Sequence, residues 1–194
     1  RDSYYELVAG AFDIDKERGR QYGEYLGLDT ARVYADYQQM AQTESAREDG
    51  IHVVGIMTPN NTHYKIAKTF LEAGIHVILE KPITTTTDDA LSLIRLAQEK
   101  DLLCASMYCY SGYPMVRQAR AMVDAGELGE ITVVQTEFAH GNCATAVEQN
   151  SEGAAWRNDP KTSGGTFVLG DVGTHALHLA TFITGQQVRE VAAD

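Results

Sequence analysis

Residues 51–82 have the sequence IHVVGIMTPNNTHYKIAKTFLEAGIHVILEKP, which places a helical pattern between two short apolar runs. The runs at residues 51–57 and 75–79 are rich in β-branched residues, which favours strands. Between them, apolar residues recur at the spacing of one helix face, namely Ile66, Ala67, Phe70 and Leu71. Because both strands are apolar continuously rather than alternately, they predict a βαβ unit in a parallel sheet covered on both faces.

The same alternation of strands and helices continues on both sides of this unit. Further short strands are expected at residues 7–11, 32–34 and 102–107. Helices are expected at about residues 15–26 with Gly27 as a cap, from Asp36 to about 47, from Asp88 to beyond Ala97, and from Pro114 to Gly126 or Gly129. Such a chain, with right-handed crossovers, predicts an α/β fold with a Rossmann-like, doubly wound parallel sheet.

The pattern changes after Gly129. Residues 131–140 form a longer run with polar alternation, which is typical of a strand in a sheet with one face in water. A loop rich in Gly, Asn, Ser and Asp then extends to about residue 165, and a helix is expected at about residues 174–184. We therefore expect a domain boundary near Gly129, so that residues 1–129 and 130–194 belong to different domains.

Composition excludes several classes of function. The net charge of −11 argues against a nucleic-acid-binding or anionic-membrane surface, and no apolar run approaches the length of a membrane span. The three cysteines (Cys104, Cys109 and Cys143) are an odd number without CxxC spacing, which favours a reducing, cytoplasmic location. The chain opens at Arg1 and stops at Asp194 beside apolar runs, and we expect both ends to be cuts through a larger protein.

Asp13 follows the first apolar run and has two interpretations. A carboxylate after the second strand of a dinucleotide fold accepts hydrogen bonds from the adenosine ribose and disfavours a 2′-phosphate. Alternatively, Asp13 or Asp15 simply caps the next helix, which is the commoner role of such a residue. The G-x-G-x-x-G spacing that binds a pyrophosphate occurs nowhere in the sequence, so the residues alone do not argue for a dinucleotide.

Polar residues also follow two predicted strands, at the edge where open α/β sheets bind ligands. The first group is residues 58–63, TPNNTH, in which Asn60 or Thr62 equally fits a helix N-cap. The second is residues 80–82, EKP. The ammonium of Lys81 could hydrogen-bond a substrate hydroxyl and stabilise a developing oxyanion there, although a lone lysine at a strand end is usually a solvated surface residue.

A third group of polar residues surrounds the start of the last predicted helix. Asp171 and His175 are four residues apart, so on a helix they share a face, where a carboxylate can fix the tautomer of an imidazole and raise its basicity. His175 would then act as a general base. A metal site formed by Asp171, His175 and His178 is a weaker alternative, because histidines at this spacing are common by accident.

Taken in order, these segments resemble the Gfo/Idh/MocA oxidoreductases (the glucose-fructose oxidoreductase and inositol dehydrogenase family). The resemblance rests on residues 58–63, 73–77, 80–82, 125–131, 156–157, 163–165 and 170–175. It implies a partial NAD(P)-binding Rossmann domain at residues 1–129. Residues 130–194 would begin a substrate domain whose open, mostly antiparallel sheet often forms a homo-oligomer interface.

The resemblance also implies roles for individual residues. The catalytic group would be Lys81, Asp171 and His175. The cofactor, NAD rather than NADP, would contact Asp13, Thr58, Pro59, Asn60, His63, Glu80, Lys81 and Pro82. The substrate would contact Lys81, Trp156, Arg157, His175 and His178. Tyr108 and Cys109 replace a His–Asn pair of close relatives, and His178 replaces an Asp or Asn, which leaves the substrate open.

The expected activity is hydride transfer between a nicotinamide cofactor and a secondary alcohol of a sugar, cyclitol or related polyol, without a metal. Two alternatives are a dinucleotide-binding regulator or scaffold that does not turn over, and a metal-dependent polyol enzyme. Having both Lys81 and the Asp171/His175 pair argues against a regulator, since a pure binder needs neither. A parallel sheet without a central strand has unpaired edges, so we expect swapping, aggregation or partner chains for this segment alone.

Overall fold

The computed structural model describes residues 4–139 and 159–192. The chain divides into two compact units, each described by itself. The first contains Arg1–Thr58, Thr62–Leu79 and Thr87–Ala105, and the second contains Pro59–Asn61, Glu80–Thr86 and Ser106–Asp194. The predicted boundary near Gly129 stays a prediction.

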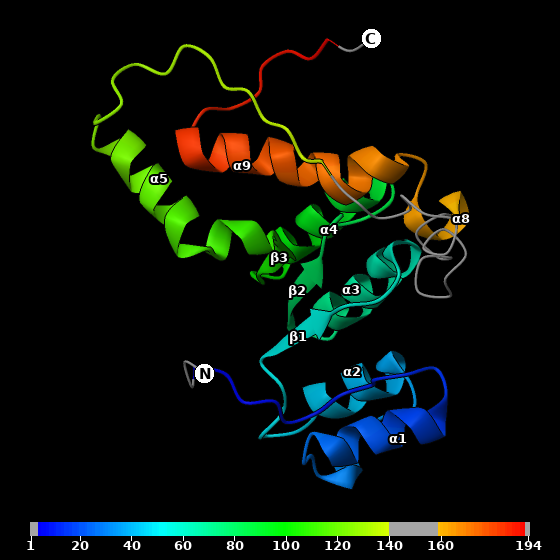
Figure 1. Ribbon diagram of the computed structural model, residues 1–194. Coiled ribbons are helices and arrows are strands. Elements are labelled where there is room, and N and C mark those ends of the chain that lie inside the picture. The colour runs from blue at the N-terminus through cyan, green and yellow to red at the C-terminus, as the bar shows by residue number, and fades with distance from the viewer. Residues whose placement is uncertain (1–3, 140–158, 193–194) are drawn as a thin grey trace. The chain divides into compact units, whose positions relative to one another are not determined.

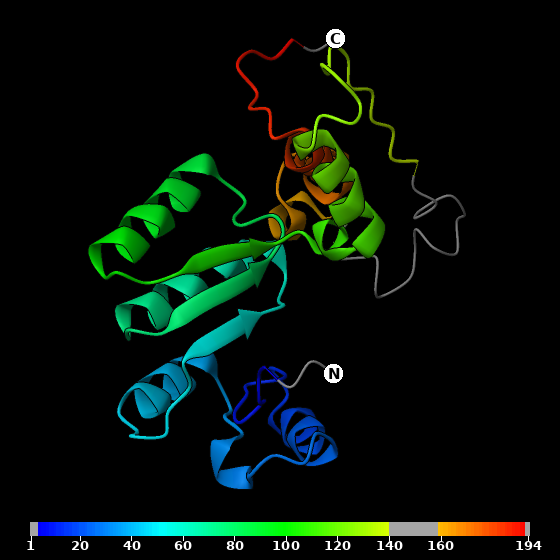
Figure 2. The same ribbon diagram turned by 90° about the vertical axis from the view of Figure 1, so that its left-hand side faces the viewer.

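A parallel sheet is the centre of the first unit. Its strands β1 (Val53–Ile56), β2 (His76–Glu80) and β3 (Cys104–Met107) lie in the order β1-β2-β3. β1 and β2 pair in parallel, and Figure 2 shows all three arrows pointing the same way. The prediction of an α/β, Rossmann-like fold with a parallel sheet is therefore confirmed.

The helices α3 (His63–Glu72) and α4 (Thr87–Glu99) follow β1 and β2 and pack against each other (Figure 1). The largest apolar side chains that are fully buried come from these elements: Phe70, Leu71, Leu79, Leu93 and Val77. Burying one such side chain stabilises a fold by about 1.5–3 kcal/mol. The apolar stripe of residues 51–82 thus becomes the core between the sheet and its helices.

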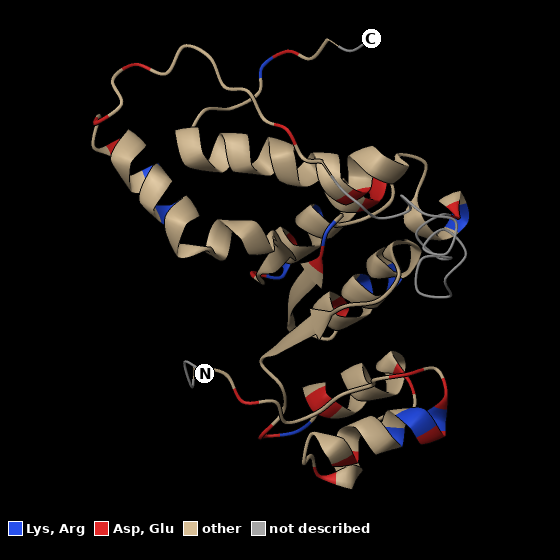
Figure 3. Ribbon diagram, viewed as in Figure 1, with Lys and Arg blue, Asp and Glu red and all other residues tan. Residues whose placement is uncertain are grey.

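Side-chain caps fix the first two helices where the sequence predicts them. Asp15 accepts hydrogen bonds from the backbone of Glu17 and Arg18 at the start of α1 (Lys16–Tyr25). Asp36 accepts one from Gln39 at the start of α2 (Tyr37–Ser45). Such caps satisfy backbone N–H groups that have no partner within the helix. Figure 3 shows acidic and basic residues mixed on α1, whereas α9 (Thr174–Thr184) in the second unit carries none.

The predicted strands at residues 7–11 and 32–34 are wrong in extent. They pair only through an isolated parallel bridge between Gly10 and Val33. The side chain of Asp29 accepts a hydrogen bond from Ala31, and residues Thr30–Arg32 wind into the short helix η1. Because this turn takes the chain out of an extended conformation, it leaves too few residues to continue the ladder.

The second unit is largely helical. It contains η3 (Cys109–Gly112), α5 (Pro114–Asp124), α8 (Pro160–Ser163), the π-helical turn η4 (Leu169–Gly173) and α9. Figures 1 and 2 show α5 beside α9, and η3 packs against both. The guanidinium of Arg120 on α5 lies 4.9 Å from the ring centroid of Phe182 on α9. Gly185 ends α9 in the left-handed conformation that glycine adopts without strain. Among the described residues, no helix has the length and hydropathy that a membrane crossing requires.

Residues 131–139 are not the strand that the sequence predicts, and residue 140 lies outside the described residues. A strand needs a neighbour for its backbone N–H and C=O groups. No described residue pairs with this segment as a strand, and its Ile131 carbonyl accepts a hydrogen bond from the side chain of Gln186 instead, at 3.4 Å. The predicted open antiparallel sheet is therefore not formed by these residues.

Candidate active site

Lys81 and Asp171 form a close ion pair in the second unit. The ammonium of Lys81, just after β2, donates to both a carboxylate oxygen and the backbone carbonyl of Asp171, each at 2.5 Å. The Lys81 side chain is 15% exposed and that of Asp171 is 39% exposed. Asp171 lies in η4, and π-helical turns occur frequently at functional sites. The lysine is therefore held in place rather than solvated, which favours the functional interpretation of Lys81.

His175 lies in the first turn of α9 and is only 6% exposed. Aromatic rings surround its imidazole, with centroid distances of 4.7 Å to Tyr110, 5.7 Å to Tyr108 and 6.1 Å to Phe138. Its Nδ1 atom is buried and has no hydrogen-bond partner among the described residues. A buried polar nitrogen without a partner is costly, so this atom offers a bond to a bound molecule or an ordered water.

The pKa of His175 lies below its ordinary value. Burial is the largest cause, because it disfavours the charged imidazolium, and the positive charge of Lys81 is the second. The carboxylates of Asp171 and Glu80 act in the opposite direction with smaller effects. The imidazole is therefore neutral at neutral pH and able to accept a proton.

The predicted hydrogen bond between Asp171 and His175 is not formed. The Asp171 carboxylate bonds to the ammonium of Lys81 instead. A charge-assisted bond to an ammonium is stronger than one to a neutral imidazole. No carboxylate of the described residues therefore fixes the tautomer of the imidazole by a hydrogen bond. The charge of Asp171 still raises the pKa of His175, but burial and the charge of Lys81 outweigh it.

His178 belongs to a stack of rings. Its ring is parallel to that of Tyr108 within 8° at 4.0 Å, and it also stacks on Phe182 at 5.8 Å. The hydroxyl groups of Tyr108 and Thr174 are hydrogen-bonded at 2.7 Å. Burial lowers the pKa of His178 as well. Within residues 4–139 and 159–192, no three His, Cys, Asp or Glu residues are grouped as metal ligands.

The loop after β1 is tied together by its own side chains. In the first unit, Thr58 and Thr62 share a hydrogen bond between their hydroxyl groups at 2.6 Å, and a ring nitrogen of the fully buried His63 lies 2.8 Å from the Thr58 carbonyl oxygen. Thr62 occupies the N-cap of α3 without a side-chain capping bond. In the second unit, Asn60 donates to the Ser163 carbonyl at 2.9 Å. Neither Asn60 nor Thr62 therefore caps α3 through its side chain, and the buried His63 supports the loop.

Asp13 is engaged by Arg18 in the first unit. Both carboxylate oxygens accept from the guanidinium, at 2.6 and 2.9 Å, and the backbone N–H of Asp15 donates to the same carboxylate. The bonds to Arg18 lower the pKa of Asp13 and keep it charged. Because Asp15 caps α1, the capping interpretation applies to Asp15 rather than to Asp13.

The remaining predicted residues are placed as follows. Glu80 ends β2, and the peptide bond between Lys81 and Pro82 is cis. Pro59 lies in the loop after β1, and Trp156 and Arg157 lie outside the described residues. Two neighbours of His175, Tyr110 and Phe138, are not among the residues predicted from the sequence. The aromatic run YCYSGY at residues 108–113 was the available signal for Tyr110.

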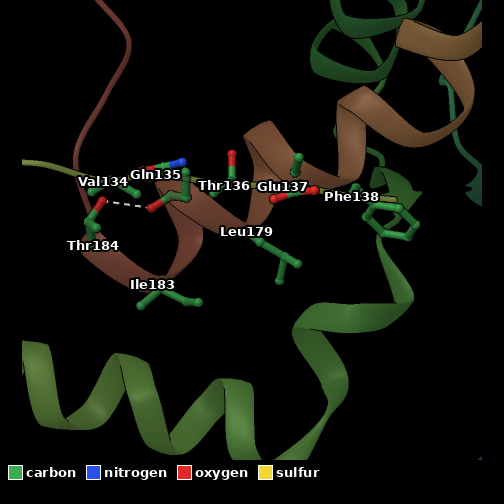
Figure 4. Close-up of a pocket in the computed structure, with 10 residues that line it drawn as sticks. Val134, Gln135, Thr136, Glu137, Phe138, Leu179, Ile183 and Thr184 are labelled. Atoms are coloured by element: carbon green, nitrogen blue, oxygen red, sulfur yellow. Dashed lines mark hydrogen bonds between the residues drawn. The ribbon is translucent and has the colours of Figure 1, made fainter. Parts of the chain in front are cut away.

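A cavity of about 340 Å³ lies in the second unit between residues 134–138 and α9, and its lining includes Phe138, a neighbour of His175. Its walls include Val134, Phe138, Leu179 and Ile183 (Figure 4). Beside it, the hydroxyl of Thr184 donates to the Ala180 carbonyl at 2.7 Å, drawn as a dashed line. None of the predicted catalytic residues lines this cavity, so the candidate site is defined by the chemistry around Lys81.

Comparison with protein families gives two matches that together cover most of the chain. The family described as "Oxidoreductase family, NAD-binding Rossmann fold" matches residues 2–108. The family described as "GFO/IDH/MocA C-terminal domain" matches residues 116–194.

Comparison with individual proteins gives similar results. The uncharacterized oxidoreductase YfiI of Bacillus subtilis (strain 168) is 44% identical over 98% of this chain and 49% of its own length. An inositol dehydrogenase homolog from Azotobacter vinelandii, complexed with NAD+, is 45% identical with a TM-score of 0.90, over 95% of this chain and 48% of that one. The structure from that organism with NADH and myo-inositol is 43% identical with a TM-score of 0.85, over 96% and 47%. This chain thus spans about half the length of these relatives.

Proposed function

We propose that this chain, which belongs to the GFO/IDH/MocA oxidoreductase family, takes part in hydride transfer between a nicotinamide dinucleotide and a secondary alcohol. The alcohol would belong to a sugar, cyclitol or related polyol. The observation that carries this proposal is the anchored ammonium of Lys81, whose charge acts on the buried, neutral imidazole of His175. The myo-inositol in the complex of the Azotobacter vinelandii relative supports the substrate class.

His175 and Lys81 would have separate roles at the hydroxyl group during an alcohol oxidation. Such a reaction removes a hydride from the carbon and a proton from its hydroxyl group. The neutral imidazole of His175 accepts the hydroxyl proton, and the ammonium of Lys81 hydrogen-bonds the same oxygen as negative charge develops on it. In the reverse direction, the imidazolium returns the proton to that oxygen. The nicotinamide ring, when bound, supplies the acceptor or donor of the hydride.

Several residues of the chain fit a bound dinucleotide. Asp13 carries a charged carboxylate, which suits the hydroxyl groups of a ribose and repels a 2′-phosphate, so we propose NAD rather than NADP. The loop after β1 and the end of β2 offer hydroxyl, amide and carboxylate groups. The proposed contacts are Asp13, Thr58, Pro59, Asn60, His63, Glu80, Lys81 and Pro82. For the substrate, we propose Lys81, Trp156, Arg157, His175 and His178.

The contacts of Lys81 and of the rings near His175 also suggest how a polyol would be held. Asp171 takes two hydrogen bonds from the ammonium, so one ammonium hydrogen is left to direct at a substrate oxygen. The face of Tyr108 is covered by His178, and the hydroxyl of Tyr108 is occupied by Thr174. We therefore propose that recognition of the reacting hydroxyl group depends on Lys81 and His175, with Asp171 as the residue that orients the lysine.

The test is turnover of polyols by the purified protein with NAD or NADP. Lys81→Met and His175→Asn should each lower kcat by about 100-fold or more. NAD binding measured by calorimetry should be kept in His175→Asn, because His175 is not among the proposed cofactor contacts. Lys68→Met is a matched control, because Lys68 is 45% exposed on α3 and pairs only loosely with Glu72 at 3.8 Å. Turnover of Lys81→Met and His175→Asn at the rate of the unchanged protein would overturn the proposal.

A further inference from the structure

The imidazole of His175 lacks the usual means of fixing its orientation. In most sites, one ring nitrogen bonds a carboxylate or backbone carbonyl, and this bond fixes the tautomer and the ring plane. Here Nδ1 is buried without a partner within residues 4–139 and 159–192, and the carboxylate of Asp171 is bonded to Lys81. Contacts with other rings must therefore set the orientation of this imidazole.

Tyr110 is the nearest of these rings. Its centroid lies 4.7 Å from that of His175 and its plane is inclined by 70°, which is a favourable edge-to-face arrangement. Phe138 braces Tyr110 from another side at 5.7 Å, and Tyr113 does so at 5.6 Å. The ring of Tyr110 is thus itself held by two neighbours, so it can act as a rigid support.

We propose that Tyr110 is a positioning residue for His175, and that its ring replaces the missing hydrogen-bonded partner in fixing and desolvating the imidazole. The ring, rather than the hydroxyl group, carries this role, because the contact between Tyr110 and His175 is a contact between their rings. The catalytic consequence rests on the proposed function, whereas the effect on the imidazole does not.

The charges around His175 determine the direction of the expected change. Lys81 and His178 disfavour its protonation, Asp171 and Glu80 favour it, and burial is larger than any of these effects. Removing the ring of Tyr110 admits water and weakens the effect of burial. The pKa of His175 should then rise toward its ordinary value of 6.5.

The experiment compares Tyr110→Leu and Tyr110→Phe with the unchanged protein. Nuclear magnetic resonance follows the titration of His175, whose signal is assigned by its loss in His175→Asn. Tyr110→Leu should raise the pKa of His175 and thereby move the acidic limb of the pH–rate profile to higher pH. It should also lower kcat by about 10-fold with little change in KM. Tyr110→Phe should match the unchanged protein within about twofold in kcat, because it keeps the ring.

Controls separate this role from a general loss of structure. Tyr25→Leu removes a ring that is 85% exposed in the first unit and should change neither the titration nor kcat. If Tyr110→Leu does not fold, Tyr110→Met retains side-chain volume without a ring and takes its place. An unchanged His175 titration in a folded ringless variant, or a shift of the same size in Tyr110→Phe, would overturn the proposal. A shifted titration in a protein that turns over no polyol would support the positioning role and count against the proposed function.

Discussion

The ammonium of Lys81 donates to Asp171 twice, once to its carboxylate and once to its backbone carbonyl, each at 2.5 Å. The backbone contact survives any change of the Asp171 side chain, whereas the carboxylate contact does not. The two contacts can therefore be separated experimentally.

Asp171→Asn should lower kcat by about 10²-fold, because the ammonium loses its charged partner and is held by the backbone carbonyl without it. The pKa of His175 should fall further, since the carboxylate of Asp171 favours protonation of the imidazole. A pH–rate profile and a titration by nuclear magnetic resonance measure the two effects. Glu127→Gln, on the exposed surface, is the control. A rise in the pKa of His175 would contradict the assignment.

Breaking the buried pair of Arg32 and Glu44 should destabilise the first unit. The Glu44 side chain is 0% exposed and that of Arg32 is 11% exposed. Tyr34 also donates to this carboxylate, at 2.7 Å. Glu44→Gln leaves the buried guanidinium with only the exposed carboxylate of Asp49, 3.7 Å away, as a counter-charge. The free energy of unfolding should therefore fall by about 3 kcal/mol. Urea denaturation measures this, with Glu48→Gln as the exposed control. A loss of unfolding free energy in Glu44→Gln as small as that in Glu48→Gln would contradict this prediction.

Stability should also depend on pH through His175. Its folded pKa is below 6.5, so the unfolded chain takes up a proton at a higher pH than the folded one. The contribution is complete above pH 6.5 and is lost as the pH falls through 6.5 toward the folded pKa. Thermal melting followed from about pH 8 to about pH 5 should show a fall that is smaller in His175→Asn. Equal slopes for both proteins would show that His175 does not contribute.

Asp13 should set the preference between the two dinucleotides. Asp13→Ser removes the charge that repels a 2′-phosphate and releases Arg18, which then has no carboxylate partner at that position. We expect NAD affinity to fall by about 10-fold and NADP affinity to rise relative to it. Calorimetry with each dinucleotide tests this, with Glu24→Gln on α1 as the control. An unchanged ratio of affinities would remove Asp13 from the proposed cofactor contacts.

The sequence predicts the fold best where the chain supplies its own partners. Residues 51–82 form a unit in which strand, helix and strand bury one another, so the apolar pattern predicts the elements. Residues 131–139 depend on a neighbour that no described segment provides, and a short-range pattern carries no information about it. At residues 30–32, the local bond of Asp29 overrides the strand pattern.

The candidate site shows the same limit. Lys81 and His175 stand out because their residue types and flanking motifs carry chemistry that a sequence displays. Their partners do not stand out, because which acceptor an ammonium reaches is decided in three dimensions. Asp171 therefore bonds to Lys81 rather than to His175. The ring of Tyr110 contacts the imidazole from a loop to which the sequence pattern assigned no role.

The contacts of the candidate site also have a consequence for the order of folding. Lys81 and Asp171 are 90 positions apart, and Asn60 and Ser163 are 103 positions apart. Contacts between such distant positions form slowly, because a long loop must close before they stabilise anything, whereas the sheet forms from neighbours in the chain. We expect the strands to form before the hydrogen bond between Lys81 and Asp171. A refolding chain should therefore regain its secondary structure before its candidate site is assembled.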